Sequence, residues 1–343
     1  MSNLTSNQET YSQIMSYKSG EPLKIPKYQR EYDWDPQMVD LLIQDIMKHY
    51  RVYMSANDEN KYNYFTGTIV SHQEKTGEPR FIVDGQQRLT TLTVIACALR
   101  DIILYARNQT KWDVDGFEIS GAKWIPEVDG DSGEEAIDTI LSLLRKVIHK
   151  TGGTPESSAI LELKQTDEAR IKWIISDWFE KKEYLCKKTF EWRVGKGAKG
   201  LPNYSGGGLP KIYKTYLRTW ELFGKKGLGG EEFENFGVIE VKDECFPFDN
   251  NTGIWKSDGS DDKYKQQEWE LVSNKEEMKK AIHKISQFSH SFRELCDVIV
   301  VKCKDSWQAH VIFDRANSAG KKLAMIDIIR AKLFAELDKT GAT

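Results

Sequence analysis

The chain has 343 residues, of which 39% are hydrophobic and 29% are charged, and its formal net charge is −3. This length allows two domains with cores of their own, and no apolar run reaches the roughly 18 residues that a membrane span needs. The N-terminus lacks the basic and apolar segments of a secretion signal, so we expect a cytoplasmic protein without membrane contact. The five cysteines form no Cys-x-x-Cys pair, which argues against a disulfide framework and against a zinc site.

Charge is unevenly distributed along the chain. Residues 113–138 contain nine acidic side chains and one basic, and residues 231–270 contain twelve acidic and four basic. Between them, residues 170–230 contain fourteen basic and five acidic side chains, a local net charge of +9. We call residues 170–230 the basic stretch. A chain divided in this way can present one positive face to nucleic acid while the rest of its surface repels it.

The first elements are short. Residues 1–20 are polar and predict a poorly ordered lead-in with some helix at 12–17. The segment 23–28 is expected to be extended, because a residue that precedes a proline avoids the helical region. A longer helix then begins with Asp35 as its N-cap and Pro36 in its first turn.

A hairpin followed by a helix forms the central feature of the sequence. Residues 65–71 and 81–83 predict the two strands, Asp84 and Gly85 the next turn, and residues 89–106 an apolar helix. A helix that begins directly after a strand points unpaired backbone N–H groups at whatever lies over the turn. Together with the helix dipole, these groups form a ready anion site.

Two interpretations of this turn remain open on the residues alone. In the simpler one, Asp84 caps the helix, Gly85 takes a positive φ, and Gln86 and Gln87 are solvated. In the other, the two glutamines and Arg88 are functional, because they provide more hydrogen-bonding capacity than a tight turn needs. A guanidinium group at this position is suited to binding phosphate.

The remainder of the chain predicts mainly helices. We expect helices at 134–150, 167–187, 210–223 and 275–296, a strand at 298–303, and helices at 307–316 and 324–337 around a turn at 317–320. Residues 195–200 match a dinucleotide fingerprint by their letters, but neither the preceding strand nor the following helix is present. We interpret this segment as a mobile basic loop. Its Arg193, Lys196 and Lys199 either contact DNA phosphates or form an ordinary solvated face.

Three separated blocks carry a resemblance to a known family. They are residues 25–34 (IPKYQREYDW), residues 65–70 (FTGTIV) with 83–92 (VDGQQRLTTL), and residues 312–323 (IFDRANSAGKKL) with 327–330 (DIIR). Together these blocks resemble the N-terminal domain of GmrSD-type restriction endonucleases and of the phosphorothioate-sensing protein SspE. One departure is Ala316, where the family usually has leucine.

The resemblance implies an α+β fold with a ParB/sulfiredoxin-like core. The core would be a small mixed sheet with helices over residues 21–110, after the lead-in at 1–20. The helices predicted from the apolar periodicity of residues 111–343 indicate a mainly helical domain that contains the basic stretch. The block at 298–335 would pack back on the core.

The resemblance also implies a nucleoside triphosphatase that uses GTP or several triphosphates and Mg²⁺. Asp84 would hold the metal, Gln86 or Gln87 would orient the attacking water, and Arg88 would neutralise developing charge, which are the roles that phosphoryl transfer requires. The nucleotide-binding set would consist of Tyr28, Gln29, Arg30, Gly85, Thr90, Asn317, Asp327 and Arg330.

Simpler alternatives remain for several of these residues and for the function. Tyr28, Tyr32 and Trp34 can pack on the core, and Asp327 with Arg330 can form an i,i+3 ion pair. The same turn can belong to a module that binds nucleotide or DNA as a signal without hydrolysis. Relatives carry a C-terminal HNH nuclease, but none of the six histidines here lies in such a cluster. We therefore expect DNA cleavage to come from another domain or from a partner protein.

Overall fold

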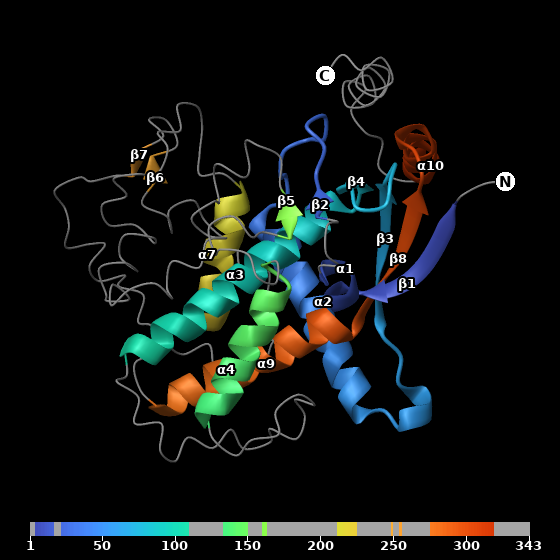
Figure 1. The fold of residues 1–343 in the computed structure, drawn as a ribbon. Coiled ribbons are helices and arrows are strands. Elements are labelled where there is room, and N and C mark those ends of the chain that lie inside the picture. The colour runs from blue at the N-terminus through green and yellow to red at the C-terminus, as the bar shows by residue number, and fades with distance from the viewer. Residues whose placement is uncertain are drawn as a thin grey trace.

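A mixed six-stranded sheet with helices forms the fold, so the predicted α+β class is confirmed (Figure 1). The computed structural model describes residues 4–16, 22–109, 133–149, 160–162, 211–224, 248–249, 254–255 and 275–318. The strands of the sheet are β1 (Thr5–Thr10), β2 (Leu23–Lys24), β3 (Tyr64–His72), β4 (Arg80–Asp84), β5 (Leu161–Glu162) and β8 (Cys296–Cys303). Strands β6 (Phe248–Asp249) and β7 (Ile254–Trp255) form a separate pair.

The strand order is β1-β8-β3-β4-β2-β5. Strands β3 and β4 are antiparallel, which confirms the predicted hairpin, whereas β3 is parallel to β8 and β2 is parallel to both β4 and β5. The division of the chain at about residue 110 stays a prediction. Strands from both sides of that position lie in one sheet, and the described part of the C-terminal block supplies β8 and the following helix.

The prediction of a poorly ordered lead-in is wrong for residues 5–10, which form a strand, whereas the short helix predicted at 12–17 is present at Tyr11–Met15. Strand β1 pairs antiparallel with β8, from Thr5 opposite Lys302 to Thr10 opposite Asp297. Helix α1 (Tyr11–Met15) follows, with Thr10 and Gln13 forming a reciprocal capping box. The strand was missed because its residues are polar and mostly exposed. Its stability comes from pairing with a distant apolar strand, which local periodicity does not reveal.

The helices lie on both faces of the sheet. They are α2 (Pro36–Ser55), α3 (Gln86–Gln109), α4 (Gly133–Lys146), α7 (Lys211–Gly224), α9 (Lys275–Glu294) and α10 (Ser306–Ser318), with a 3₁₀ turn, η1 (Asp58–Asn60). Ile69 and Ile82 face the main core under α2, α3 and α9, whereas their neighbours Val70 and Val83 pack with Ala309 of α10. Since successive side chains of a strand point to opposite faces, α10 covers the other face of the sheet. Figure 1 shows α10 standing apart from the other helices.

The side chains of α3 that the structure describes, residues 86–104, are buried on nearly all sides rather than on one face. The helix contacts α4, α7 and α9, and Arg100 and Asp101 are both fully buried on it. The two side chains form an ion pair with 2.9 Å between Arg100 Nη2 and Asp101 Oδ1. Tyr216 donates its hydroxyl to Asp101, and His149 Nε2 lies 3.1 Å from Arg100 Nη1. The pair is therefore hydrogen-bonded from two other parts of the chain, which is the condition for burying charge.

Candidate functional site

The strand-to-helix junction has the geometry that the sequence predicts. Strand β4 ends at Asp84, Gly85 has a φ of 86°, and α3 begins at Gln86. A Cβ atom on Gly85 would lie 2.7 Å from Cγ1 of Ile69 and 3.2 Å from the carbonyl oxygen of Thr68, so only glycine fits. The first helical bond runs from Leu89 N to Gly85 O. The N–H groups before Leu89 therefore have no partner within the helix.

Asp84 is a partly buried carboxylate beside two arginines. Its Oδ1 accepts a hydrogen bond of 2.8 Å from the backbone N–H of Gly85, which is the local contact of the simpler interpretation. Burial raises the pKa of Asp84, and the Gly85 N–H, Arg88 and Arg30 oppose this shift. Both arginines therefore lie within electrostatic reach of one carboxylate, which agrees with the family resemblance that places Arg30 beside the turn. The net rise means that the surroundings do not fully offset the cost of burying the negative charge.

Arg88 has a buried nitrogen without a partner. Its Nη1 is shielded from solvent and forms no hydrogen bond in the part of the chain that the structure describes. Burial lowers the pKa of Arg88, and the nearby Asp84 and Tyr64 act in the opposite direction. A buried unpaired donor costs free energy, so such groups concentrate at sites where a ligand or function accounts for them.

Gln29 and Gln86 attach the segment 28–34, which we call the site loop, to the junction. Gln29 Nε2 donates to the carbonyl oxygen of Val83 at 2.8 Å, and Gln86 Nε2 donates to Gln29 Oε1 at 2.9 Å. Both glutamines are buried. The predicted proximity of Gln29 to the turn is therefore present, and it takes the form of a hydrogen-bonded chain.

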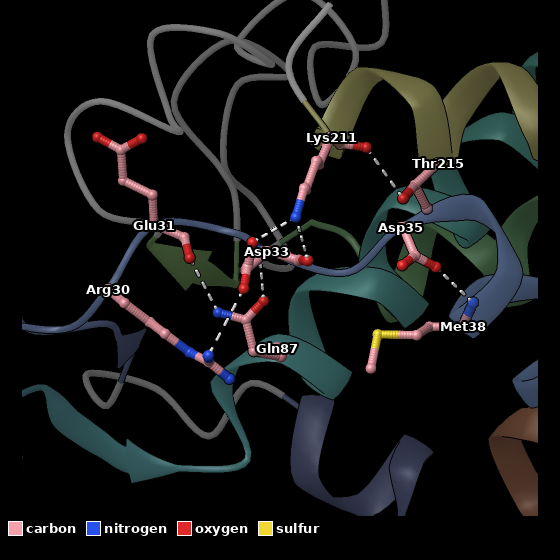
Figure 2. Close-up of polar contacts among 8 residues, drawn as sticks. All are labelled: Arg30, Glu31, Asp33, Asp35, Met38, Gln87, Lys211 and Thr215. Carbon is pink, nitrogen blue, oxygen red and sulfur yellow. Dashed lines mark hydrogen bonds and ion pairs between the residues drawn. The ribbon is translucent and has the colours of Figure 1, made fainter. Parts of the chain in front are cut away.

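Gln87 fixes the next part of the site loop, as Figure 2 shows. Its Oε1 accepts from the backbone N–H of Asp33 at 2.8 Å, and its Nε2 donates to the carbonyl oxygen of Glu31 at 3.1 Å. Both polar groups of this amide are thus used by the loop. The prediction that Gln86 or Gln87 orients water stays a prediction.

Asp33 lies between two cationic side chains (Figure 2). Its carboxylate is 3.7 Å from Arg30 Nη1, and Lys211 Nζ donates both to this carboxylate and to the Asp33 carbonyl oxygen. Lys211 is the first residue of α7 and belongs to the basic stretch. Sequence reasoning did not single it out, since no local pattern indicates a partner 178 positions away.

The aromatic residues of the site loop pack inward. The Tyr32 hydroxyl lies 2.8 Å from the Thr91 hydroxyl and 2.9 Å from that of Thr215, and Trp34 packs against the main core. The packing interpretation is confirmed for these two residues. The Tyr28 ring lies 5.1 Å from the ring of His310 on α10, so this residue connects the loop to the C-terminal block.

The other candidates differ in what the structure describes. Thr90 is buried in the first turns of α3. Asn317 lies in α10, which continues to Ser318, whereas the sequence predicted a turn from residue 317. Residues 193, 196, 199, 327 and 330 lie outside the described part of the chain, so their predicted roles stay predictions.

Asp84 meets the chemical requirement for a magnesium ligand. Mg²⁺ is usually held by one or two carboxylates together with water and phosphate oxygens. A carboxylate whose pKa is raised by burial gains when a cation approaches it. Within the described ranges, no three histidine, cysteine or acidic side chains gather into a group. A search of the same ranges for a helix able to cross a bilayer also finds none.

Fold and site together define an α+β domain with a candidate anion site at a strand-to-helix junction, held beneath a hydrogen-bonded loop. The family model described as the GmrSD restriction endonuclease N-terminal domain matches residues 11–334. The chain belongs to this family, and it therefore has a role in a restriction system, which acts on DNA. No curated protein matches the chain.

Proposed function

We propose that the chain is the nucleoside triphosphatase and sensor domain of an antiviral restriction system, coupling hydrolysis of GTP or several triphosphates to recognition of modified DNA. The observation that carries this proposal is the proximity of Asp84 and Arg88 at the start of α3. Burial raises the pKa of Asp84 and lowers that of Arg88, and each side chain lies within electrostatic reach of the other. Charged groups with pKa values shifted in this way concentrate at functional sites.

The triphosphate binds through positive charge at the helix N-terminus. Backbone N–H groups after Gly85 and the guanidinium groups of Arg88 and Arg30 bind phosphate oxygens and stabilise charge that develops there. Arg30 reaches the ligand by leaving Asp33, a weak exposed partner at 3.7 Å. Asp84 would hold a Mg²⁺ ion, which would supply positive charge to neutralise the phosphate groups.

The water-orienting role falls to Gln86 rather than Gln87. Both polar groups of the Gln87 amide are bonded to the site loop. The side-chain nitrogen of Gln86 donates to Gln29. The side-chain oxygen of Gln86 has no donor among the described residues and can accept a hydrogen bond from water. An acceptor at this point can orient a water for attack on the terminal phosphate.

A module that binds nucleotide or DNA without hydrolysis is the second candidate. The hydrogen bonds of Gln86 and Gln87 to the site loop favour this candidate, because they give both glutamines a structural role without catalysis. The basic stretch serves DNA contact in both candidates. Lys211 of that stretch binds Asp33 of the site loop, which supports communication between the two regions. The cut itself is made by a nuclease domain or a partner protein.

Measuring phosphate release from each of the four ribonucleoside triphosphates, with and without DNA, decides between the candidates. We expect Mg²⁺-dependent turnover that the Arg88→Ala variant lacks. Binding of a triphosphate without release in a single-turnover assay would favour the binding module.

A further inference from the structure

Strand β3 is irregular at Gly67. On β3, Phe65 pairs with Asp297 and Thr68 pairs with Ile299, so three steps along β3 match two along β8. Gly67 lies in this bulge with a φ of 114°, a conformation that residues with a side chain rarely adopt. The Thr66 hydroxyl donates to the Asp297 carbonyl oxygen at 3.0 Å and holds the bulge against β8.

The guanidinium group of Arg88 occupies the place where a side chain of Gly67 would be. A Cβ atom on Gly67 would lie 2.9 Å from Nη2, 3.1 Å from Nη1 and 3.2 Å from Cζ of Arg88. These contacts come from the far end of a flexible side chain. A methyl group at Gly67 would therefore displace the Arg88 guanidinium more readily than the backbone.

The residues that the structure describes provide no hydrogen-bonded or ionic partner for the end of this side chain. In the described part of the chain, Arg88 forms no hydrogen bond or ion pair, and its Nη1 is buried without a partner. The electrostatic influence of Asp84 and Tyr64 on Arg88 has no directional contact behind it. The backbone at Gly67 lies close against the end of this side chain.

We propose that Gly67 is a positioning residue for Arg88, because the bulge in β3 brings backbone without a side chain against the guanidinium group beside the anion site. This inference rests on the proposed function where it concerns hydrolysis. A misplacement of about 1 Å in a catalytic group can cost on the order of 10²-fold in rate. Gly67 thus acts through Arg88 and touches no substrate itself.

The test is a double-mutant cycle of Gly67→Ala and Arg88→Ala in the full chain, read first by urea unfolding. Gly77→Ala is the matched control, because Gly77 also has a positive φ, 91°, but has open space where its Cβ would be. We expect Gly67→Ala to lower the urea midpoint more than Gly77→Ala does, and this excess to vanish when Arg88 is alanine. An equal loss in both backgrounds overturns the proposal. This arm does not depend on hydrolysis, so it stands even if the protein releases no phosphate.

Kinetics provide the second readout. We expect Gly67→Ala to lower kcat by about 10²-fold with KM changed less than threefold, a smaller loss than that of Arg88→Ala. Gly77→Ala should hydrolyse as wild type does. An unchanged kcat, or a loss that follows only the folded fraction, overturns the positioning role. No phosphate release from the wild type, combined with coupled urea midpoints, overturns the proposed function and leaves the Gly67–Arg88 contact supported.

Discussion

Lys211 binds Asp33 across 178 positions of the chain, donating to its carbonyl oxygen at 3.0 Å and to its carboxylate. The contact joins the first residue of α7 to the site loop. Both side chains are about half exposed, at 45% and 55%, so the pair contributes little to folding. The contact is important because it holds the site loop and because Asp33 also forms an ion pair with Arg30.

We predict that Lys211→Ala lowers stability by only about 0–1 kcal/mol and raises KM for the triphosphate more than it lowers kcat. Without Lys211, Asp33 keeps Arg30 as its cationic partner and competes with phosphate for it. Urea unfolding and steady-state kinetics at low and high salt check this. Lys214→Ala on the same helix is the control. Equal KM values for the Lys211→Ala and Lys214→Ala variants would contradict the role of the contact.

Gln87→Glu tests whether this residue holds the loop. A carboxylate still accepts from Asp33 N–H but no longer donates to the Glu31 carbonyl oxygen. We expect a loss of about 1–3 kcal/mol in the free energy of unfolding, because the part-buried bond to Glu31 is lost and the buried side chain at position 87 becomes charged. Gln37→Glu, on the exposed first turn of α2, should change stability far less. Urea unfolding of both variants gives the comparison. Unchanged stability with abolished hydrolysis would instead assign Gln87 to the attacking water.

Asp84→Asn should separate stability from activity. Burial raises the pKa of Asp84 above its ordinary value of 3.8, so the folded protein holds this proton more tightly than the unfolded chain does. The contribution of Asp84 to stability therefore falls as pH rises from 3.8 through the raised pKa. Asparagine keeps an oxygen for the Gly85 N–H and carries no charge.

We expect the Asp84→Asn variant to be more stable than wild type at pH 7 and to lose Mg²⁺-dependent hydrolysis. The difference in unfolding free energy should shrink as pH falls towards the ordinary carboxyl pKa. Urea unfolding of both proteins at intervals of about one pH unit, from about pH 4 to about pH 8, measures this difference. Asp138→Asn, on the exposed side of α4, is the control. A variant less stable than wild type, with hydrolysis intact, would show that Asp84 serves only as a turn cap.

Arg88→Ala should abolish hydrolysis and leave the fold intact. An arginine that stabilises the transferred phosphoryl group can be worth about 10³–10⁵ in rate. Folding should not suffer, because the removed cation has no hydrogen-bonded partner among the described residues. Phosphate release and thermal unfolding check both statements, with Arg145→Ala on α4 as control. A folded variant within about threefold of the wild-type rate means that the phosphate site lies elsewhere.

The triple variant of Arg193, Lys196 and Lys199 to alanine tests DNA contact by the basic stretch. We expect affinity to fall by a similar factor for all sequences, with a salt slope shallower by up to about 0.9 for each DNA phosphate that the variant no longer neutralises. Hydrolysis without DNA should barely change. A matched triple variant of three exposed lysines, Lys27, Lys75 and Lys304, should keep the wild-type slope. Unchanged DNA affinity in the first variant would move the DNA-binding surface to the face around Arg30.

The junction was predictable because its signals are local. Three elements follow one another directly in the chain: an apolar strand, a glycine that must take a positive φ, and an apolar helix. Each has its own sequence pattern. The same holds for Asp35, which caps α2 through Met38 N at 3.0 Å. The sequence pattern could not predict the hydrogen bonds that the side-chain amides of Gln86 and Gln87 form, because their partners lie more than fifty positions away.

The buried pair in α3 shows a second limit of sequence reasoning. A hydrophobic stripe predicts one buried face, and Arg100 and Asp101 would then be exposed. They are buried because Tyr216 and His149, from later parts of the chain, satisfy them. Such burial depends on tertiary partners that a single-sequence pattern does not identify.

The order of strands in the sheet bears on how the protein is made. Gln8 of β1 hydrogen-bonds Asp297 of β8, 289 positions later, and β8 also pairs with β3. At a synthesis rate of about 5–20 residues per second, roughly 15–60 s pass before β8 follows β1 out of the ribosome. During this time β3 has the hairpin partner β4 on one side and an open edge on the other. Pairing over such sequence distances is intrinsically slow, so the unfinished sheet is the stage at which the nascent chain is most exposed to aggregation and to chaperones.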